Sequence, residues 1–276
     1  MLHQRLLIWL FIFTLTGCIP IGPRKSATLR IKGSDTMLLV MEKLAQVYMM
    51  NNPNTSIYVE GGGTAGGIEA LIEGNVDICS ASRLLLPGES RRISQKYQSV
   101  GYYARVAKDA LSVYVHPENP IKDITLKQLK LIFSGQITNW DEVGGFDHAI
   151  LLLIRPPNSG TYQYFKEHIL QDLDYSREAL TITTTQEIVN RVMQDSAAIG
   201  YGGIAYGPDN IHSRINGIKP SMDNVRFDLY PISRYLYLYT IRKPKGTQRE
   251  FIDWIITKEG QTIVQNTGYI SIWAVD

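Results

Sequence analysis

Short strands alternate with helical stretches along most of this 276-residue chain, and that order restricts the possible folds more than any other feature. Strands are expected at residues 29–32, 56–60 and 76–79, and helices at 37–50 and 68–73. Strands that alternate with helices in this way indicate an α/β fold with a mainly parallel sheet.

The second half of the chain continues the alternation without a visible linker. Six apolar residues in a row at 149–154 are typical of a strand that is buried on both faces. Internal repeats and low-complexity tracts are absent from the sequence. We therefore expect two lobes that exchange strands, and not two units in succession. The remaining elements are expected as strands at 111–116 and 234–241 and as helices at 126–133, 162–170 and 248–257.

Three strands end in a turn that combines glycine with a hydroxyl side chain and then opens a helix. These turns are Gly33–Thr36, Gly63–Gly66 and Asn158–Thr161. A helix N-terminus offers unpaired backbone N–H donors and a partial positive charge, so it can hold an anion. Each turn could instead be only a helix N-cap. Because ligands of open α/β sheets bind at the carboxyl ends of the strands, three such turns together predict an anion site.

Two arginines stand beside these turns. Arg83 lies just beyond a strand end, and Arg155 directly follows the apolar run, four residues before Ser159. A guanidinium group presents a rigid fork that can hold two oxygens of a tetrahedral anion. The alternative role for either arginine is an ordinary salt bridge at the surface.

The start of the chain reads as a leader peptide. Arg5 precedes ten uncharged residues, Leu6–Leu15, which is about half the ~20 apolar residues that a spanning helix needs. The segment ends in Leu-Thr-Gly-Cys18, which resembles the lipobox of bacterial lipoprotein signal peptides. We expect a signal peptide at 1–17, lipidation of Cys18 and a Pro/Gly/Lys tether at 18–27. The alternative is a plain signal peptide with an incidental cysteine.

Charge and residue spacing exclude several classes of protein. With 28 basic and 26 acidic residues the net charge is +2, which does not fit a nucleic-acid-binding surface. The five histidines show no metal-ligand spacing, and the chain has neither a C-x-x-C nor a G-x-S-x-G motif. No metal, cofactor or covalent chemistry is therefore expected, and the protein is not predicted to be an enzyme.

The segment Gly61–Gly66 matches the G-x-G-x-x-G pattern of dinucleotide-binding proteins. Such a site needs an acidic residue at the end of the next strand. Here Asp77 lies at the start of that strand, and serines occupy its far end. The pattern therefore does not predict a dinucleotide site.

Five motifs in a fixed order connect these observations. They are residues 33–37 (GSDTM), 60–68 (EGGGTAGGI), 76–83 (VDICSASR), Arg155 with 159–161 (SGT), and 199–204 (IGYGGI). In this order they resemble the PstS-type phosphate-binding lipoproteins, the solute-binding components of phosphate ABC importers. The similarity extends over about residues 29–272, including 133–140 (FSGQITNW) and the closing segment 251–272.

The resemblance implies an α/β, two-lobed, type II periplasmic-binding-protein-like fold with crossing hinge strands. Lobe I would comprise residues 28–110 and 236–276, and lobe II residues 111–235. It also implies a set of anion-contacting residues, at these positions of the chain: Ser34, Asp35, Thr36, Thr64, Ser82, Arg83, Arg155, Ser159, Gly160 and Thr161.

Two positions depart from the family pattern. Some members place an acid where Arg83 stands, to accept the proton of HPO4 2−, and an acid two residues after Arg155, where this chain has Pro157. Asp35 could replace the missing acceptor, or it could serve as a helix N-cap.

The function implied by the resemblance is extracytoplasmic capture of inorganic phosphate by lobe closure and its delivery to ABC permease subunits. The protein would be a monomer, anchored by lipid to a bacterial membrane on the periplasmic side or at the cell surface. The alternative is that the same scaffold binds another oxyanion, such as sulfate or a phosphate ester, as a sensor or surface adhesion protein.

Overall fold

The computed structural model describes residues 26–171 and 173–275. The predicted signal peptide, Cys18 and most of the 18–27 tether lie outside these residues. Within the described part of the chain, no helix is both long enough and apolar enough to cross a membrane.

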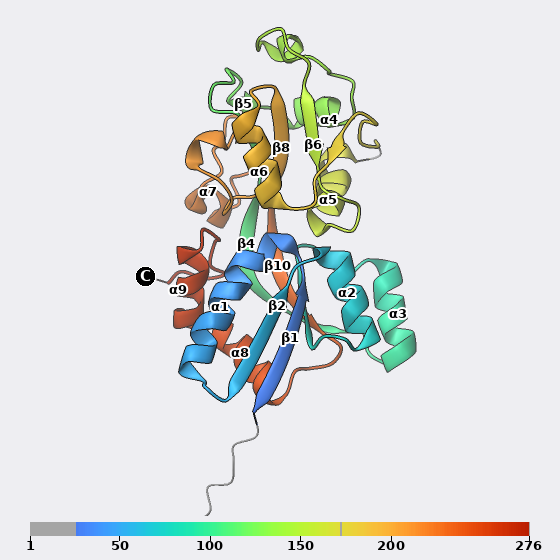
Figure 1. The fold of residues 1–276 in the computed structure, drawn as a ribbon, viewed down its shortest axis with the longest axis vertical. Coiled ribbons are helices and arrows are strands. Elements are labelled where there is room, and N and C mark those ends of the chain that lie inside the picture. The colour runs from blue at the N-terminus through green and yellow to red at the C-terminus, as the bar shows by residue number, and fades with distance from the viewer. Residues whose placement is uncertain (1–25, 172, 276) are drawn as a thin grey trace, which may run out of the picture.

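One sheet of eight strands organises the molecule, in the order β2-β1-β3-β10-β4-β8-β6-β7 (Figure 1). A short parallel pair, β5 and β9, lies apart from it. Their bounds are β1 Ala27–Gly33, β2 Thr55–Glu60, β3 Ile78–Ala81, β4 Tyr102–Val115, β5 Asp123–Ile124, β6 Leu151–Ile154, β7 Leu180–Thr181, β8 Ala198–Gly203, β9 Arg214–Ile215 and β10 Ser233–Thr240.

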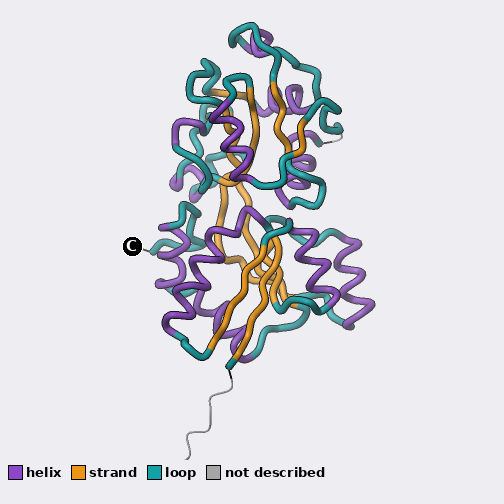
Figure 2. The backbone as a smooth tube through the Cα atoms, in the orientation of Figure 1, coloured by secondary structure: helices purple, strands orange, loops and turns teal. Residues whose placement is uncertain are grey.

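Helices surround this sheet in both halves of the molecule (Figure 2). Their bounds are α1 Leu38–Asn51, α2 Gly63–Glu73, α3 Pro87–Tyr97, α4 Leu126–Phe133, α5 Gly160–Phe165, α6 Thr185–Gln194, α7 Met222–Arg226, α8 Gly246–Ile255 and α9 Lys258–Asn266. Single turns are η1 Asp35–Met37, η2 Trp140–Val143, η3 Lys166–Leu170 and η4 Asp209–Ile211.

Two strands, β4 and β10, join the two lobes that Figure 1 shows. The first part of β4, residues 102–110, pairs antiparallel with β10, and its last part, Leu111–Val115, pairs antiparallel with β8. The predicted two-lobed α/β fold with crossing strands is therefore confirmed. The strand predicted at 111–116 is only the second part of β4, because Tyr102, Tyr103 and Arg105 are exposed and interrupt the apolar pattern.

The hydrophobic core divides at the middle of β4. Val106 and Ala107 belong to a cluster built on α1, β1 and α8, which includes Met41 and Phe251. Ala110 and Leu111 belong to another cluster, which includes the stacked rings of Phe165 and Tyr201 with centroids 4.2 Å apart. Each lobe thus packs its own interior, and the crossing strands contribute to both.

Two predicted helices differ from those observed. The helix expected at 68–73 begins earlier, at Gly63, because the glycine-rich turn itself enters the helix. The helix expected at 162–170 is α5 followed by one π-helical turn, η3. In both cases the hydroxyl-bearing turn forms the first residues of the helix.

Candidate functional site

A cluster of buried hydroxyl groups lies where the turns of the two lobes meet. The Oγ1 atoms of Thr36 and Thr161 are 2.9 Å apart, although the two residues come from η1 and α5. Thr64, in the first turn of α2, has its Oγ1 3.3 Å from Ser82 Oγ. All four side chains are at most 1% exposed. The structure therefore brings the three predicted turns and the end of β3 together.

Backbone contacts hold these turns close to one another. Ser34 N–H donates to Ser80 O at 2.9 Å, and Ala65 N–H donates to Asn158 O at 3.1 Å. At Gly160 a Cβ atom would lie only 2.4 Å from both Ser82 Oγ and Thr64 Oγ1. Glycine is therefore required at this position, since only it lets the start of α5 approach the hydroxyls.

Within the α5 turn, Ser159 is the N-cap, and its Oγ accepts from Thr161 N–H at 3.2 Å. Ser159 is 3% exposed and Ser34 is also 3% exposed. Ser34 precedes η1 without making a side-chain cap bond. Its hydroxyl is not used to cap the helix that it precedes.

Arg155 extends from the end of β6 into this cluster with a side chain only 1% exposed. Its Nη1 donates to Thr185 Oγ1 at 2.8 Å, and its Nη2 donates to Asp35 Oδ2 at 2.6 Å. Its Nε is buried and has no partner among the described residues. The guanidinium group is thus oriented by two residues, while the N–H of Nε has no acceptor among the described residues.

Asp35 has a role that neither alternative from the sequence anticipated. Its Oδ1 accepts from Gly62 N–H at 2.9 Å, and its Oδ2 accepts from Arg155. The residue in the cap position of η1 is Ser34, so Asp35 is not the N-cap. Asp35 is the counter-ion of Arg155, which it reaches from the other lobe.

The structure does not bring the Arg83 guanidinium into contact with the hydroxyls. Its Nη1 and Nη2 donate to Glu89 at 2.8 and 2.7 Å, and Nη1 also donates to Leu84 O. Arg83 instead lines a cavity of about 480 Å³ beside the cluster, together with Ser82 and Arg234. Arg83 thus forms a salt bridge, as in the alternative, but the pair is buried and not at the surface, and an anion-binding role for Arg83 stays a prediction.

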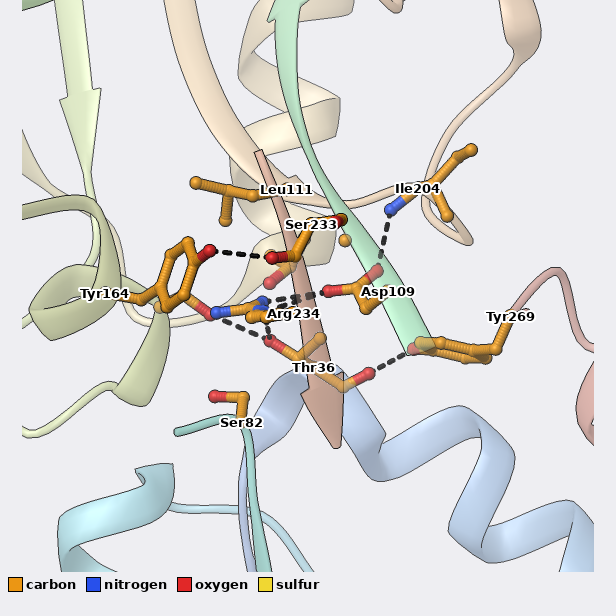
Figure 3. A network of polar contacts seen from close by, with 12 residues as sticks. Thr36, Ser82, Asp109, Leu111, Tyr164, Ile204, Ser233, Arg234 and Tyr269 are labelled. Atoms are coloured by element: carbon orange, nitrogen blue, oxygen red, sulfur yellow. Dashed lines mark hydrogen bonds and ion pairs between the residues drawn. The ribbon is translucent and has the colours of Figure 1, made fainter. Parts of the chain in front are cut away.

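A second buried ion pair at the cluster was not predicted. Arg234 on β10 donates from Nε and Nη2 to Asp109 Oδ2 at 3.1 and 3.0 Å (Figure 3). The same Nη2 lies 3.1 Å from Thr161 Oγ1 and 3.4 Å from Thr36 Oγ1. Burial raises the pKa of Asp109, and Arg234 opposes that rise. The available signal in the sequence was Arg234, the one charged residue of the aromatic and apolar strand β10; Asp109 lies in β4 beside a second charged residue, Lys108.

The arrangement is suited to hold an anion. The cluster offers two guanidinium groups, several hydroxyls and the N-termini of helices, while the nearby carboxylates of Asp35 and Asp109 are each bound by an arginine. Donors in a buried site of this kind stabilise negative charge. Among the described residues, no group of three or more His, Cys, Asp or Glu side chains is arranged to hold a metal ion.

Comparison with known proteins agrees with this geometry. The sequence model described as "PBP superfamily domain" matches residues 20–259. Phosphate-binding protein PstS of Bacillus subtilis (strain 168) is 31% identical over 256 residues, covering 90% of this chain and 82% of that protein. The chain belongs to the PstS family. PstS of Pseudomonas aeruginosa is 30% identical over 270 residues, covering 90% and 84% of the two chains.

Solved structures related to this PstS family member share its fold. One is a phosphate ABC transporter substrate-binding protein with bound phosphate from Clostridium perfringens, with a TM-score of 0.82, 29% identity, and coverage of 89% of this chain and 100% of that chain. Another is an ABC-type phosphate transport receptor from Vibrio cholerae, with a TM-score of 0.69, 27% identity, and coverage of 88% and 99%. The fold is the type II periplasmic-binding-protein-like fold expected from the sequence.

Proposed function

We propose that this protein binds inorganic phosphate outside the cytoplasm and delivers it to an ABC importer. It is a binding protein without covalent chemistry, and lobe closure surrounds the anion. The proposal rests on the buried donor cluster between the lobes and on the names of its relatives.

The observation that carries the proposal is the presence of buried, unpartnered donors at one cluster. Arg155 Nε and Arg234 Nη1 have no partner among the described residues. A buried donor without an acceptor is costly, as is a doubly charged anion without donors. An oxyanion bound in the cluster would provide acceptors for these donors and would receive the donors that it needs. The residues that it would contact are Ser34, Thr36, Thr64, Ser82, Arg155, Ser159, Gly160 and Thr161, while Asp35 holds Arg155.

The lobe boundaries that we propose are 28–110 with 236–276, and 111–235. The division of the hydrophobic core between Ala107 and Ala110 supports the first boundary, and the position of Ile232 and Leu236 in different clusters supports the second. Because Thr36 and Thr161 belong to different lobes, an anion between them would couple binding to closure.

Calorimetry with phosphate tests the assignment. Arg155→Ala removes the guanidinium group and should lower phosphate affinity by about two orders of magnitude, since charge-assisted bonds are lost in a buried site. Arg92→Ala, which removes an exposed partner of Glu69, is the matched control and should bind as the wild type does. Near-wild-type affinity of Arg155→Ala would remove Arg155 from the site.

A second candidate ligand is another tetrahedral oxyanion such as sulfate. The observation that favours it is that Asp35 and Asp109 are each paired with an arginine, while Arg83 occupies the position where some relatives have an acid. A competition titration of phosphate against sulfate decides between them. Tighter binding of sulfate in the wild type would overturn the phosphate assignment.

We further propose that Cys18 is lipidated and anchors a monomer to the membrane, where it meets permease subunits. The leader and the Leu-Thr-Gly-Cys sequence support the anchor. Radioactive fatty acid should label the wild type but not Cys18→Ala. Equal labelling of both would exclude the anchor.

A further inference from the structure

We propose that Arg234, held by Asp109, is a positioning residue of the anion site: it directs the hydroxyl protons of Thr36 and Thr161 toward the bound anion. The inference rests on the proposed function and deepens it, because it assigns a role to a residue of the crossing strands. Figure 3 shows the guanidinium between Tyr164 and Asp109, beside Thr36.

Three parts of the molecule meet at this guanidinium group. Thr36 comes from η1 in one lobe, Thr161 from α5 in the other, and Arg234 from β10, which crosses between the lobes. Nη2 of Arg234 lies within 3.4 Å of both threonine oxygens. One side chain therefore contacts both faces of the closed site.

The hydrogen-bonding capacity of a hydroxyl group explains what this contact does. A threonine hydroxyl has one proton to donate and two lone pairs that accept. In the structure the two Oγ1 atoms are 2.9 Å apart, so one threonine can donate to the other. Nη2 of Arg234 can only donate, so a threonine oxygen that accepts from it turns a lone pair toward Arg234 and its own proton away, where a bound anion can accept that proton. Arg234 thereby favours the orientation in which the threonine hydroxyls donate to the anion.

Asp109 makes it possible to bury the positive charge of Arg234. The two residues stand directly opposite each other in the antiparallel pair of β4 and β10. Asp109 is 0% exposed and the Arg234 side chain is 2% exposed. The second carboxylate oxygen, Oδ1, accepts from Ile204 N–H at 3.2 Å. The carboxylate therefore fixes the edge of the guanidinium formed by Nε and Nη2, and Nη2 is the nitrogen that also contacts the threonines.

Further contacts limit the movement of Arg234. Its Cζ lies 5.5 Å from the centroid of the Tyr164 ring, and Tyr164 OH donates to Ser233 O at 2.7 Å. Nη1 remains buried without a partner among the described residues, and it belongs to the same planar group as Nη2. A guanidinium group held in this way, with both N–H donors of Nη1 unused, fits a preorganised site better than a pair that only joins two strands.

The test separates a positioning role from a purely structural one. Arg234→Lys keeps the positive charge beside Asp109 but replaces the planar fork by a single nitrogen, so the arrangement of Nε and Nη2 toward Asp109 and the threonines is lost. We expect the variant to keep the wild-type fold by circular dichroism and to bind phosphate about tenfold or more weakly in calorimetry. In case Arg234→Lys does not fold, the double variant Asp109→Asn/Arg234→Gln removes both charges together, and the same loss is expected.

A double-mutant cycle gives the second readout. Thr161→Val removes the hydroxyl that Arg234 would orient, so the losses caused by Arg234→Lys and Thr161→Val should not add. Lys108→Met is the control, because Lys108 is a buried cation on β4 that pairs with Asp228 and not with the threonines. It should leave phosphate affinity unchanged.

Each outcome has a distinct meaning. Wild-type affinity in a folded Arg234→Lys variant, or additive losses in the cycle, would overturn the positioning role while the wild type still binds phosphate. If the wild-type protein itself binds no phosphate in calorimetry, the proposed function fails, and the inference fails with it.

Discussion

At the scale of single residues, the counter-ion of Arg155 is the most consequential finding. Asp35 contacts Arg155 from the other lobe, whereas Thr185, its second partner, belongs to the same lobe as Arg155. The orientation of Arg155 in this protein therefore depends on the approach of the lobes.

Asp35→Asn should weaken the binding of phosphate and of sulfate by a similar factor. The variant loses the charge-assisted bond to Arg155, a loss of about 1.5–3 kcal/mol, or about tenfold to a hundredfold in affinity. A competition titration measures both anions, with Asp77→Asn, in an exposed pair with Arg30, as the control. A changed ratio of the two affinities would show that Asp35 accepts the phosphate proton directly.

His212 should make the protein less stable in mild acid. Burial lowers its pKa below the ordinary 6.5, and its Nδ1 lies 2.7 Å from Ser112 Oγ. As the pH falls through 6.5, His212 takes up a proton in the unfolded chain but not in the folded protein. The free energy of unfolding is therefore highest above this pH and decreases below it. The slope is at most about 1.4 kcal/mol per pH unit.

Urea denaturation at pH 7.5 and pH 5 checks the histidine prediction. His212→Asn should lose less stability between these two conditions than the wild type. His148→Asn removes an exposed histidine and serves as the control. An equal loss in the wild type and in His212→Asn would contradict the assignment.

At the scale of elements, the packing of α6 against β8 positions a side chain that contacts Arg155. A Cβ atom on Gly202 would lie 2.3 Å from Thr185 Cγ2, and one on Gly200 would lie 2.3 Å from Ile188 Cγ2. The glycines of β8 thus let the helix lie against the strand. Thr185, the first residue of α6, in turn accepts from Arg155 Nη1.

Gly202→Ala should therefore affect both stability and binding. The added methyl group displaces Thr185, at a cost of about 1–3 kcal/mol in the free energy of unfolding, and it also withdraws the acceptor from Arg155. Urea denaturation and phosphate calorimetry measure the two effects. Gly88→Ala, where a Cβ meets nothing within 4 Å, is the control. Unaltered phosphate affinity in Gly202→Ala would show that the position of α6 does not affect anion binding.

At the scale of the whole molecule, ligand binding should stabilise the closed form. Phosphate at about 100 times its dissociation constant adds about 2.7 kcal/mol to the free energy of unfolding, because only the folded protein binds it. The melting temperature should rise, and small-angle scattering should show a smaller radius of gyration. At the same phosphate concentration Arg155→Ala, with an affinity about a hundredfold lower, should gain only about 0.4 kcal/mol and should show a smaller decrease in radius. A wild-type radius that does not change with saturating phosphate would contradict closure.

The order of strands and helices, and the turns that carry the site, could be predicted from the amino-acid sequence alone. Helix α4 has the predicted bounds 126–133, and the three hydroxyl turns begin helices as expected. These features depend on neighbours within a few residues, because capping, apolar periodicity and glycine turns are local.

The partner of each charged residue, in contrast, depends on how the chain packs in three dimensions. Arg83 and Arg155 stand in similar places after strands, yet one pairs with Glu89 and the other with Asp35. The latter pair is separated by 120 residues, and Asp109 and Arg234 by 125, so strand register and lobe packing bring them together. A charge can be read from the sequence, but its burial and its counter-ion depend on contacts between distant parts of the chain.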